Sequence, residues 1–181
     1  MSTQEITLQN GTKLIIRPAV PADGAAIIDY LNVIAGESDN ITFGPGDFGK
    51  SIEQEQAFLK NLQDSSNEIL VVGIVEGDIC SVANISGGGR PRTEHNASFG
   101  ITVREKLWRQ GIGKAVITYL LDWAKNTQII RKINLSVRTD NSGAISLYKS
   151  VGFEQEGIHT REMLINGVFI DTVEMGKNID P

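Results

Sequence analysis

Hydrophobic and polar positions recur along this chain with two different periods, and each period predicts one kind of element. Apolar residues three or four positions apart indicate helices at residues 22–34, 51–64, 112–124 and 141–152. Runs rich in β-branched and apolar residues indicate strands at residues 12–20, 68–77, 78–87, 96–103, 132–139, 153–165 and 168–178. The order is therefore β, α, α, β, β, β, α, β, α, β, β, with no internal repeat or interdomain linker.

Turn-forming and capping residues separate these elements. Ser51 with Gln54 three residues later fits a capping box, and Asp23 or a neighbour can cap the first helix. Glycines predict hairpin turns at Gly77 and Gly167. Residues 35–50 are rich in Gly, Asp, Asn and Ser, which predicts a long irregular loop after the first helix.

Length and charge narrow the class of protein. A chain of 181 residues that is 40% hydrophobic can bury one substantial core. Its 22 acidic and 17 basic residues give a net charge of −5, which disfavours nucleic acid and anionic membranes as partners. The single cysteine, Cys80, cannot form an internal disulfide, and no Cys/His cluster has the spacing of a metal site. Since no leader or membrane-spanning segment is recognisable either, we expect a cytoplasmic protein without a metal.

The predicted helix at residues 112–124 has an unusual start. The stretch "LWRQGIGKAVITYLLDWA" places Gly111 and Gly113 at its first turn, where glycine lowers helix stability. First-turn N–H groups lack intrahelical partners and carry the positive end of the helix dipole, so glycines there give an anion direct access to the backbone. The glycines alone would suit a tight strand-to-helix turn equally well.

Local charge favours a phosphate-bearing ligand. Between residues 104 and 114, four basic residues oppose one acidic residue, a local charge of +3, from Arg104, Lys106, Arg109 and Lys114 against Glu105. A P-loop is excluded, because Trp108 and Ala115 stand where that motif needs glycine and Ser or Thr. A dinucleotide fingerprint lacks its third glycine, since Val116 occupies that position.

Three segments carry a family resemblance. "WRQGIG" fits the pattern Q/R-x-x-G-x-G/A except for Trp108 at its first position, and "NSGAISLYKSVGF" fits N-x-x-A-x-x-L-Y-x-x-x-G-F. With "LIIRPAVPADGAAI" near the N-terminus, these segments resemble the GNAT superfamily of acetyl-CoA-dependent N-acetyltransferases. The resemblance implies an α/β (α+β) fold with a mixed, mostly antiparallel sheet of about seven strands and helices on both faces. It covers most of residues 1–181, which we interpret as a single N-acetyltransferase domain.

The resemblance also implies a binding site for acetyl-CoA. The strand ending at Val103 and the strand starting near Lys132 would separate, and the pantetheine arm would fill the gap along the main chain of Ile101, Thr102 and Val103. The pyrophosphate would meet the amides of the loop and first turn, and the adenosine end would lie near Arg104, Arg109 or Lys114. Asn141 would hydrogen-bond the cofactor. The loop residues are Arg109, Gln110, Gly111, Ile112, Gly113 and Lys114.

Acetyl transfer needs a neutral amine and a proton donor for the departing thiolate. By resemblance Tyr148, next to the cofactor, is the general acid, although its apolar helical neighbours also suit a core aromatic ring. Candidate bases are less well marked. His95 has a suitable ordinary pKa but could equally be a surface or packing residue. Glu37 and Asp39, in the long loop after the first helix, could instead attract an ammonium substrate or relay its proton through water, or be ordinary solvated carboxylates. Glu94 and Ser98 are weaker alternatives.

The sequence therefore predicts an enzyme that transfers an acetyl group from acetyl-CoA to a primary amine by direct attack in a ternary complex. With Trp108 before the two glycines, the sequence most resembles the branch of ribosomal-protein N-terminal and polyamine acetyltransferases. A protein N-terminus is therefore the first expected acceptor, and a polyamine or other small amine is the second. A non-catalytic acetyl-CoA-binding sensor is the alternative from another class. Whether the chain forms a homodimer stays open at this stage.

Overall fold

A computed structural model of the chain describes residues 2–180 and contains a single eight-stranded sheet with the strand order β1-β2-β3-β4-β5-β6-β8-β7. Among these strands β5 and β6 pair in parallel, and every other neighbouring pair is antiparallel. The strands are β1 (Gln4–Thr7), β2 (Lys13–Pro18), β3 (Glu68–Val75), β4 (Asp78–Gly87), β5 (Asn96–Val103), β6 (Lys132–Arg138), β7 (Glu154–Ile165) and β8 (Val168–Asn178).

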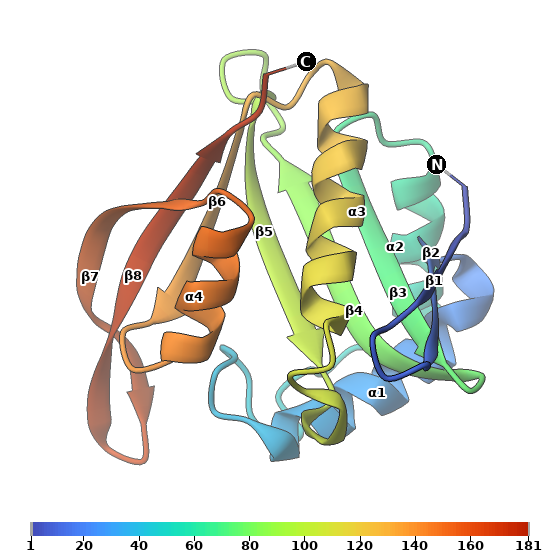
Figure 1. Cartoon of the computed structure of the whole chain (residues 1–181), viewed down its shortest axis with the longest axis horizontal. Coiled ribbons are helices and arrows are strands. Elements are labelled where there is room, and N and C mark those ends of the chain that lie inside the picture. Colours follow the sequence, from blue (N-terminus) through green and yellow to red (C-terminus); the bar gives the residue numbers. More distant parts are fainter. Residues whose placement is uncertain (1, 181) are drawn as a thin grey trace.

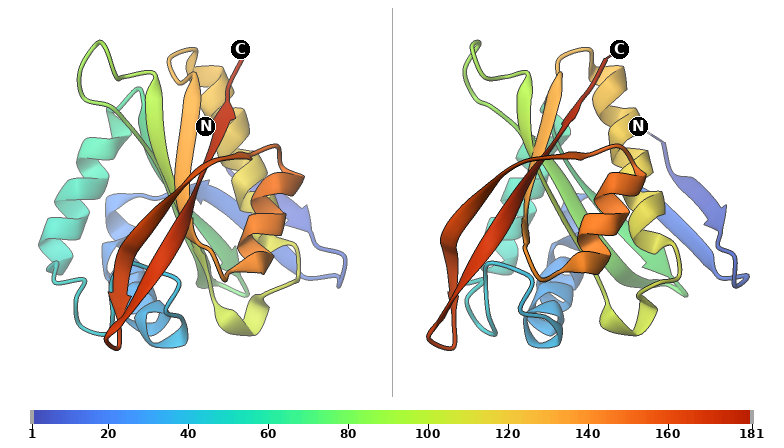
Figure 2. Two further views of the ribbon diagram at one scale, coloured as in Figure 1. Left: turned by 90° about the vertical axis from the view of Figure 1, so that its left-hand side faces the viewer. Right: turned by 60° about the vertical axis from the view of Figure 1, so that its left-hand side comes forward.

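Four helices cover the two faces of this sheet. Helices α1 (Gly24–Glu37) and α2 (Ile52–Gln63) lie on one face, and α3 (Ile112–Thr127) and α4 (Ser142–Ser150) lie on the other (Figures 1 and 2). Two hydrophobic cores result, one under α3 and α4 and a smaller one between α1, α2 and strands β3 and β4. The predicted fold class, a mostly antiparallel mixed sheet with helices on both faces, is confirmed.

The structure has one strand more than the seven that the sequence pattern marked. Strand β1 pairs antiparallel with β2, from Gln4 opposite Ile16 to Thr7 opposite Lys13, and forms the edge of the sheet. Its side chains are exposed except for Ile6, which is half-buried. An edge strand of this length carries too few apolar residues for a hydrophobic pattern to reveal it.

Local signals placed the helix starts correctly but misjudged one cap. The Ser51 capping box is confirmed: the Gln54 N–H donates to Ser51 Oγ (3.2 Å), and the Ser51 N–H donates to Gln54 Oε1 (2.8 Å). Asp23 precedes α1 but does not cap it, because its carboxylate accepts two hydrogen bonds from Arg17 (2.6 and 2.8 Å). This guanidinium lowers the pKa of Asp23. The side chain thus ties the end of β2 to the start of the helix.

Candidate active site

Strands β5 and β6 separate after a short parallel contact. They pair from Asn96–Ser98 to Lys132–Asn134, after which β5 continues along β4 and β6 continues along β8. The Arg104 N–H donates to the Cys80 carbonyl of β4 (3.0 Å). Because backbone groups alternate in direction along a strand, the N–H and C=O groups of Ile101 and Val103 point into the opening. An extended ligand with its own amides could therefore pair with this side of β5.

Thr102 lies on the other side of this alternation. Its carbonyl accepts from Ser81 Oγ (2.7 Å), and its hydroxyl accepts from the Tyr30 hydroxyl (3.0 Å) and donates to the Val82 carbonyl (3.3 Å). Of the three predicted main-chain contacts on β5, the structure thus directs Ile101 and Val103 into the opening and Thr102 away from it. Burial of Tyr30 raises the pKa of its hydroxyl, so that the hydroxyl stays a donor.

Trp108 connects the end of β5 to the loop before α3. Its indole Nε1–H donates to the Val103 carbonyl at 2.6 Å, although the ring is 44% exposed. The bond spans the short 3-10 turn Glu105–Leu107 that leads into the glycine-containing loop. Trp108 therefore fixes where this loop begins relative to the opening.

The loop before α3 presents a row of free amides. Arg109 and Gly111 both adopt left-handed conformations, with φ of 60° and 89°, and the first helical hydrogen bond runs from the Ala115 N–H to the Gly111 carbonyl (3.0 Å). The N–H groups of Ile112, Gly113 and Lys114 have no partner within residues 2–180. Such a concave run of amides at a helix start is a favourable site for an anion.

The two glycines of this loop serve different purposes. Gly111 adopts a φ of 89°, a backbone conformation that favours glycine. The space beside it is open, since a Cβ there would meet nothing closer than Leu8 Cδ2 at 3.9 Å. A Cβ on Gly113 would lie 3.0 Å from Leu147 Cδ2 of α4. Gly113 thus allows α3 and Leu147 of α4 to approach closely, whereas the space beside Gly111 is open.

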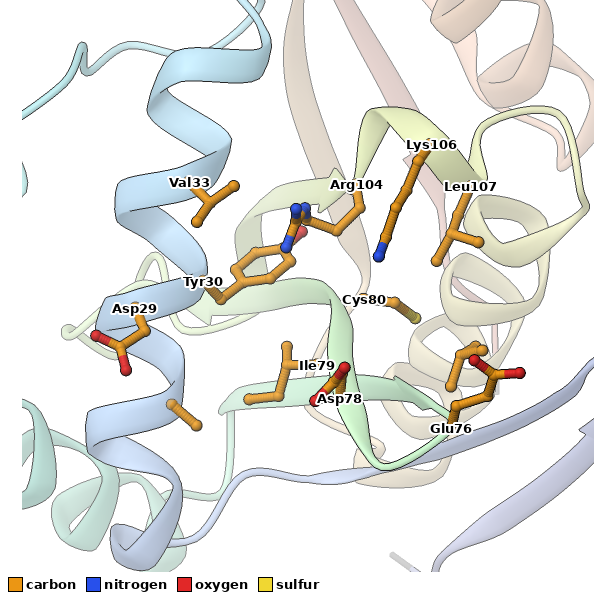
Figure 3. Close-up of a pocket in the computed structure, with 12 residues that line it drawn as sticks. Asp29, Tyr30, Val33, Glu76, Asp78, Ile79, Cys80, Arg104, Lys106 and Leu107 are labelled. Atoms are coloured by element: carbon orange, nitrogen blue, oxygen red, sulfur yellow. The ribbon is translucent and has the colours of Figure 1, made fainter.

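The basic residues around the loop are divided between two locations. Arg104 forms an ion pair with Glu37 of α1 (2.8 Å), and Lys106 points into a cavity of ≈ 400 Å³ between α1 and the β3–β4 turn (Figure 3). That leaves Arg109 and Lys114 beside the free amides. The Gln110 side chain holds the loop in place, since it accepts from Asn10 Nδ2 (2.8 Å) and donates to the Lys106 carbonyl (3.3 Å).

Tyr148 of α4 lies against the strand that borders the opening. Its ring makes edge contacts with Phe99 of β5 (centroids 6.2 Å apart) and with Phe153 (5.9 Å). Burial raises the pKa of Tyr148 to about 12, and its hydroxyl has no hydrogen-bond partner in the described part of the chain. The ring is thus a packing element, and the neutral hydroxyl stays free to donate.

Asn141 begins the same helix. Its Oδ1 accepts from the Ala144 N–H (3.1 Å), so that this oxygen caps α4. The amide nitrogen of the side chain makes no hydrogen bond within residues 2–180 and can still donate to a ligand.

The two predicted bases lie far apart. Glu37 is the last residue of α1 and not part of the loop that follows, and it accepts from Arg104 Nε and from the Glu105 N–H, both at 2.8 Å. His95 is exposed and precedes β5, at the end where β5 and β6 are paired. Six residues of extended chain, at about 3.3 Å each, place it about 20 Å from Ile101. The structure therefore brings Glu37 to the mouth of the opening and leaves His95 at the closed end.

Comparison with known proteins gives the family of this chain. The sequence profile described as "Acetyltransferase (GNAT) family" matches residues 38–153. The chain belongs to this family. The prediction of a GNAT acetyltransferase is therefore confirmed, and the matched range includes β5, the glycine loop and Tyr148.

Individual relatives agree with this assignment. The chain is 33% identical over 107 residues to the L-amino acid N-acetyltransferase AaaT of Escherichia coli and 34% identical over 91 residues to the N-alpha-acetyltransferase RimI of Mycobacterium tuberculosis. These matches cover 59% and 50% of this chain but only 66% and 55% of the relatives. A solved GNAT-family acetyltransferase from Streptococcus pneumoniae superposes with a TM-score of 0.89 at 30% identity, covering 92% of this chain and 99% of the other.

A polar floor on the sheet of this GNAT chain was not predicted. On β5, β6 and β8 the odd-numbered residues, such as Phe99, Leu135 and Met175, enter the core under α3 and α4. The even-numbered residues face the side of α1 and α2, but those helices cover β3 and β4 instead. We call the resulting surface the polar floor; its members are Ser98, Thr102, Asn134, Ser136, Arg138 and Glu174, whereas Thr172 in the same row is buried.

The strict alternation of polar and apolar residues in "KINLSVR" and "NASFGITV" was the signal for this floor. Ser98 and Ser136 are exposed, whereas Asn134 and Glu174 are half-buried. The floor borders the opening between β5 and β6 on the face opposite Tyr148, because Tyr148 packs with the core of α3 and α4. A reactant lying on the floor would approach the opening from the far side of the sheet.

The remaining features of the GNAT chain concern metals and membranes. Residues 2–180 contain no group of three or more His, Cys, Asp or Glu side chains that could hold a metal ion. No helix in the same range is long and apolar enough to span a bilayer.

Proposed function

We propose that this protein binds acetyl-CoA in the opening between β5 and β6 and transfers its acetyl group to a primary amine. The observation that supports this most directly is that two sets of main-chain groups lie at one end of β5. Main-chain groups of Ile101 and Val103 face the opening, and the free amides of Ile112–Lys114 follow at the start of α3. A related fold from Salmonella typhimurium, 19% identical with a TM-score of 0.80, was solved with acetyl-CoA.

The residues present fit this ligand. The two amides of a pantetheine arm match the exposed edge of β5, and a pyrophosphate matches the concave amides beside Gly111, where the space next to the α-carbon is open. Arg109 and Lys114 add positive charge next to those amides. Asn141 can donate from its side-chain amide nitrogen at the start of α4.

Tyr148 supports the chemistry of the transfer. The acceptor nitrogen forms a bond to the carbonyl carbon while the carbon–sulfur bond breaks, and the sulfur leaves with a proton. The Tyr148 hydroxyl has no other partner and is kept neutral by its raised pKa of about 12, so that it can donate to the departing sulfur. A backbone N–H of Ile101 or Val103 would stabilise charge on the carbonyl oxygen.

The acceptor we propose is an α-amino group, first of all a protein or peptide N-terminus. One relative is named for N-alpha-acetylation and another for L-amino acids, and both substrates present an α-amine. The open polar floor, with exposed Ser98 and Ser136, suits a solvated polar chain. A small polyamine is the second candidate, because a relative of 25% identity over 123 residues is a spermidine N(1)-acetyltransferase from Vibrio cholerae.

Two measurements test this function. Acetyl-CoA should raise the thermal unfolding midpoint, because a ligand that binds only the native state stabilises it. Release of free thiol should then depend on an added amine across a panel of peptides, amino acids, polyamines and aminoglycosides.

Each measurement has a decisive opposite result. Stabilisation without any acceptor-dependent thiol would favour the acetyl-CoA-binding sensor over the enzyme. If acetyl-CoA gave neither stabilisation nor a heat of binding, the proposed site itself would be wrong.

A further inference from the structure

Glu174 of β8 differs from the other carboxylates near the polar floor. Glu156 pairs with Lys132, and Asp140 pairs with Arg138 through two hydrogen bonds of 2.9 and 2.7 Å. Within residues 2–180, Glu174 has no lysine or arginine at ion-pair distance, and its side chain is 27% exposed. An accessible carboxylate without a cationic partner is suited to attract an ammonium group.

The neighbours of Glu174 leave it uncovered on the acceptor side. In the sheet register it lies between Ser136 of β6 and Gly157 of β7, so that a hydroxymethyl group stands on one side and no side chain on the other. Ser136 belongs to the strand that borders the opening, and it follows the last paired residue of β6, Asn134, by two positions. Glu174 is thus one strand away from the opening.

His159 of β7 extends this polar group toward solvent. Its Nδ1 lies 3.5 Å from Glu174 Oε1, and its side chain is 58% exposed. An imidazole has two ring nitrogens, so that it can take up a proton at one and release a proton from the other. The other charged groups on this side are Glu162, 3.8 Å from the same Nδ1, and the paired Arg138 and Asp140, with the Asp39 carbonyl bound to Arg138.

We propose that Glu174 accepts the proton from the acceptor ammonium and that His159 relays it to solvent. This inference rests on the proposed acetyl transfer. The ammonium gives up one proton to Glu174, and the free amine attacks the thioester carbon from the polar floor. Its second proton is lost by the same route as the carbon–nitrogen bond forms, while the sulfur leaves on the opposite face with the Tyr148 proton. Tyr148 then recovers a proton from solvent, so that the products are an amide, a thiol and one released proton.

The test measures kcat/KM for the acceptor against pH in the wild type, Glu174→Gln and His159→Asn. We expect Glu174→Gln to lower kcat/KM by about 10²-fold or more near neutral pH, because general acid–base catalysis is worth roughly 10²–10⁴-fold. The loss should shrink as pH rises, because the fraction of acceptor already present as free amine increases. His159→Asn should lower kcat/KM less than Glu174→Gln does, because solvent can still take the proton from Glu174 directly.

Glu162→Gln is the matched control, because it removes a carboxylate beside the same histidine but none from the floor. It should leave the profile unchanged, and all variants should keep the wild-type melting temperature and acetyl-CoA affinity. An unchanged pH profile in Glu174→Gln, or an equal loss in Glu162→Gln, would overturn the inference while an active wild type upheld the proposed function. A wild type that binds acetyl-CoA but releases no acceptor-dependent thiol would overturn both.

Discussion

Glu37 and Arg104, 67 positions apart in the sequence, meet at the mouth of the opening, with Arg104 Nε 2.8 Å from Glu37 Oε1. Glu37 also accepts from the Glu105 N–H (2.8 Å), so that both of its oxygens are engaged. The Arg104 side chain is only 24% exposed and the Glu37 side chain only 19%, which limits screening of the pair by solvent. This contact fastens the end of α1 to the end of β5, and it makes Glu37 a positioning residue as much as a candidate base.

Replacing Glu37 by Gln should therefore affect stability more than proton transfer. Loss of a part-buried charge pair costs about 1–2 kcal/mol of folding stability. In a domain of this size the melting temperature falls by roughly 2–4 °C for each kcal/mol lost. We expect a lower melting temperature with an unchanged shape of the pH–rate profile. A profile that lost its acidic limb in this variant, with little change in melting temperature, would instead identify Glu37 as the base.

Tyr148→Phe should remove the hydroxyl and keep the aromatic packing with Phe99 and Phe153. General-acid catalysis is worth roughly 10²–10⁴-fold, so kcat should fall by at least about tenfold while acetyl-CoA affinity stays the same. Because burial raises the Tyr148 pKa to about 12, the wild-type hydroxyl stays protonated at neutral and mildly alkaline pH and adds no alkaline limb there. Tyr119→Phe is the control, since its hydroxyl donates to the Ser2 carbonyl far from the site.

The two loop glycines should respond differently to alanine. Gly111→Ala forces a residue with a Cβ to a φ of 89°, which should lower stability by roughly 1–2 kcal/mol. Because the new Cβ also lies beside the free amides, we expect acetyl-CoA to bind at least about tenfold more weakly, or about 1.4 kcal/mol. Gly113→Ala should mainly lower stability, by about 1–3 kcal/mol, because its Cβ would press on Leu147 Cδ2. Isothermal titration and thermal unfolding measure both effects. Recovery of stability in Gly113→Ala with Leu147→Ala would confirm the steric cause.

Trp108→Phe should loosen the loop without removing much apolar surface. The variant loses the hydrogen bond to the Val103 carbonyl, worth about 1 kcal/mol, so KM for acetyl-CoA should rise about fivefold with kcat nearly unchanged. Trp123→Phe, on the core side of α3, is the control and should change stability more than KM. Equal effects of the two substitutions on KM would contradict a positioning role for Trp108.

The sequence by itself determined the element order, the fold class and the family. Its hydrophobic periods gave seven of the eight strands and all four helices, because side chains at buried positions must be apolar wherever an element packs. The segments around Gly111 and Tyr148 resemble GNAT motifs, and this resemblance implied acetyl-CoA as the ligand and Tyr148 as the proton donor. Strand β1 escaped detection because its exposed edge position imposes no such pattern.

Only the tertiary structure decided which of these residues act together. Glu37 and Arg104 pair across 67 positions, Thr102 turns away from the opening while Ile101 and Val103 face it, and Gly113 packs against Leu147. Glu174 and His159 come together because β7 and β8 pair in a particular register. No motif in the sequence links these two residues. Such relationships depend on strand register and helix packing between distant segments, and these are set by the whole core and not by local sequence.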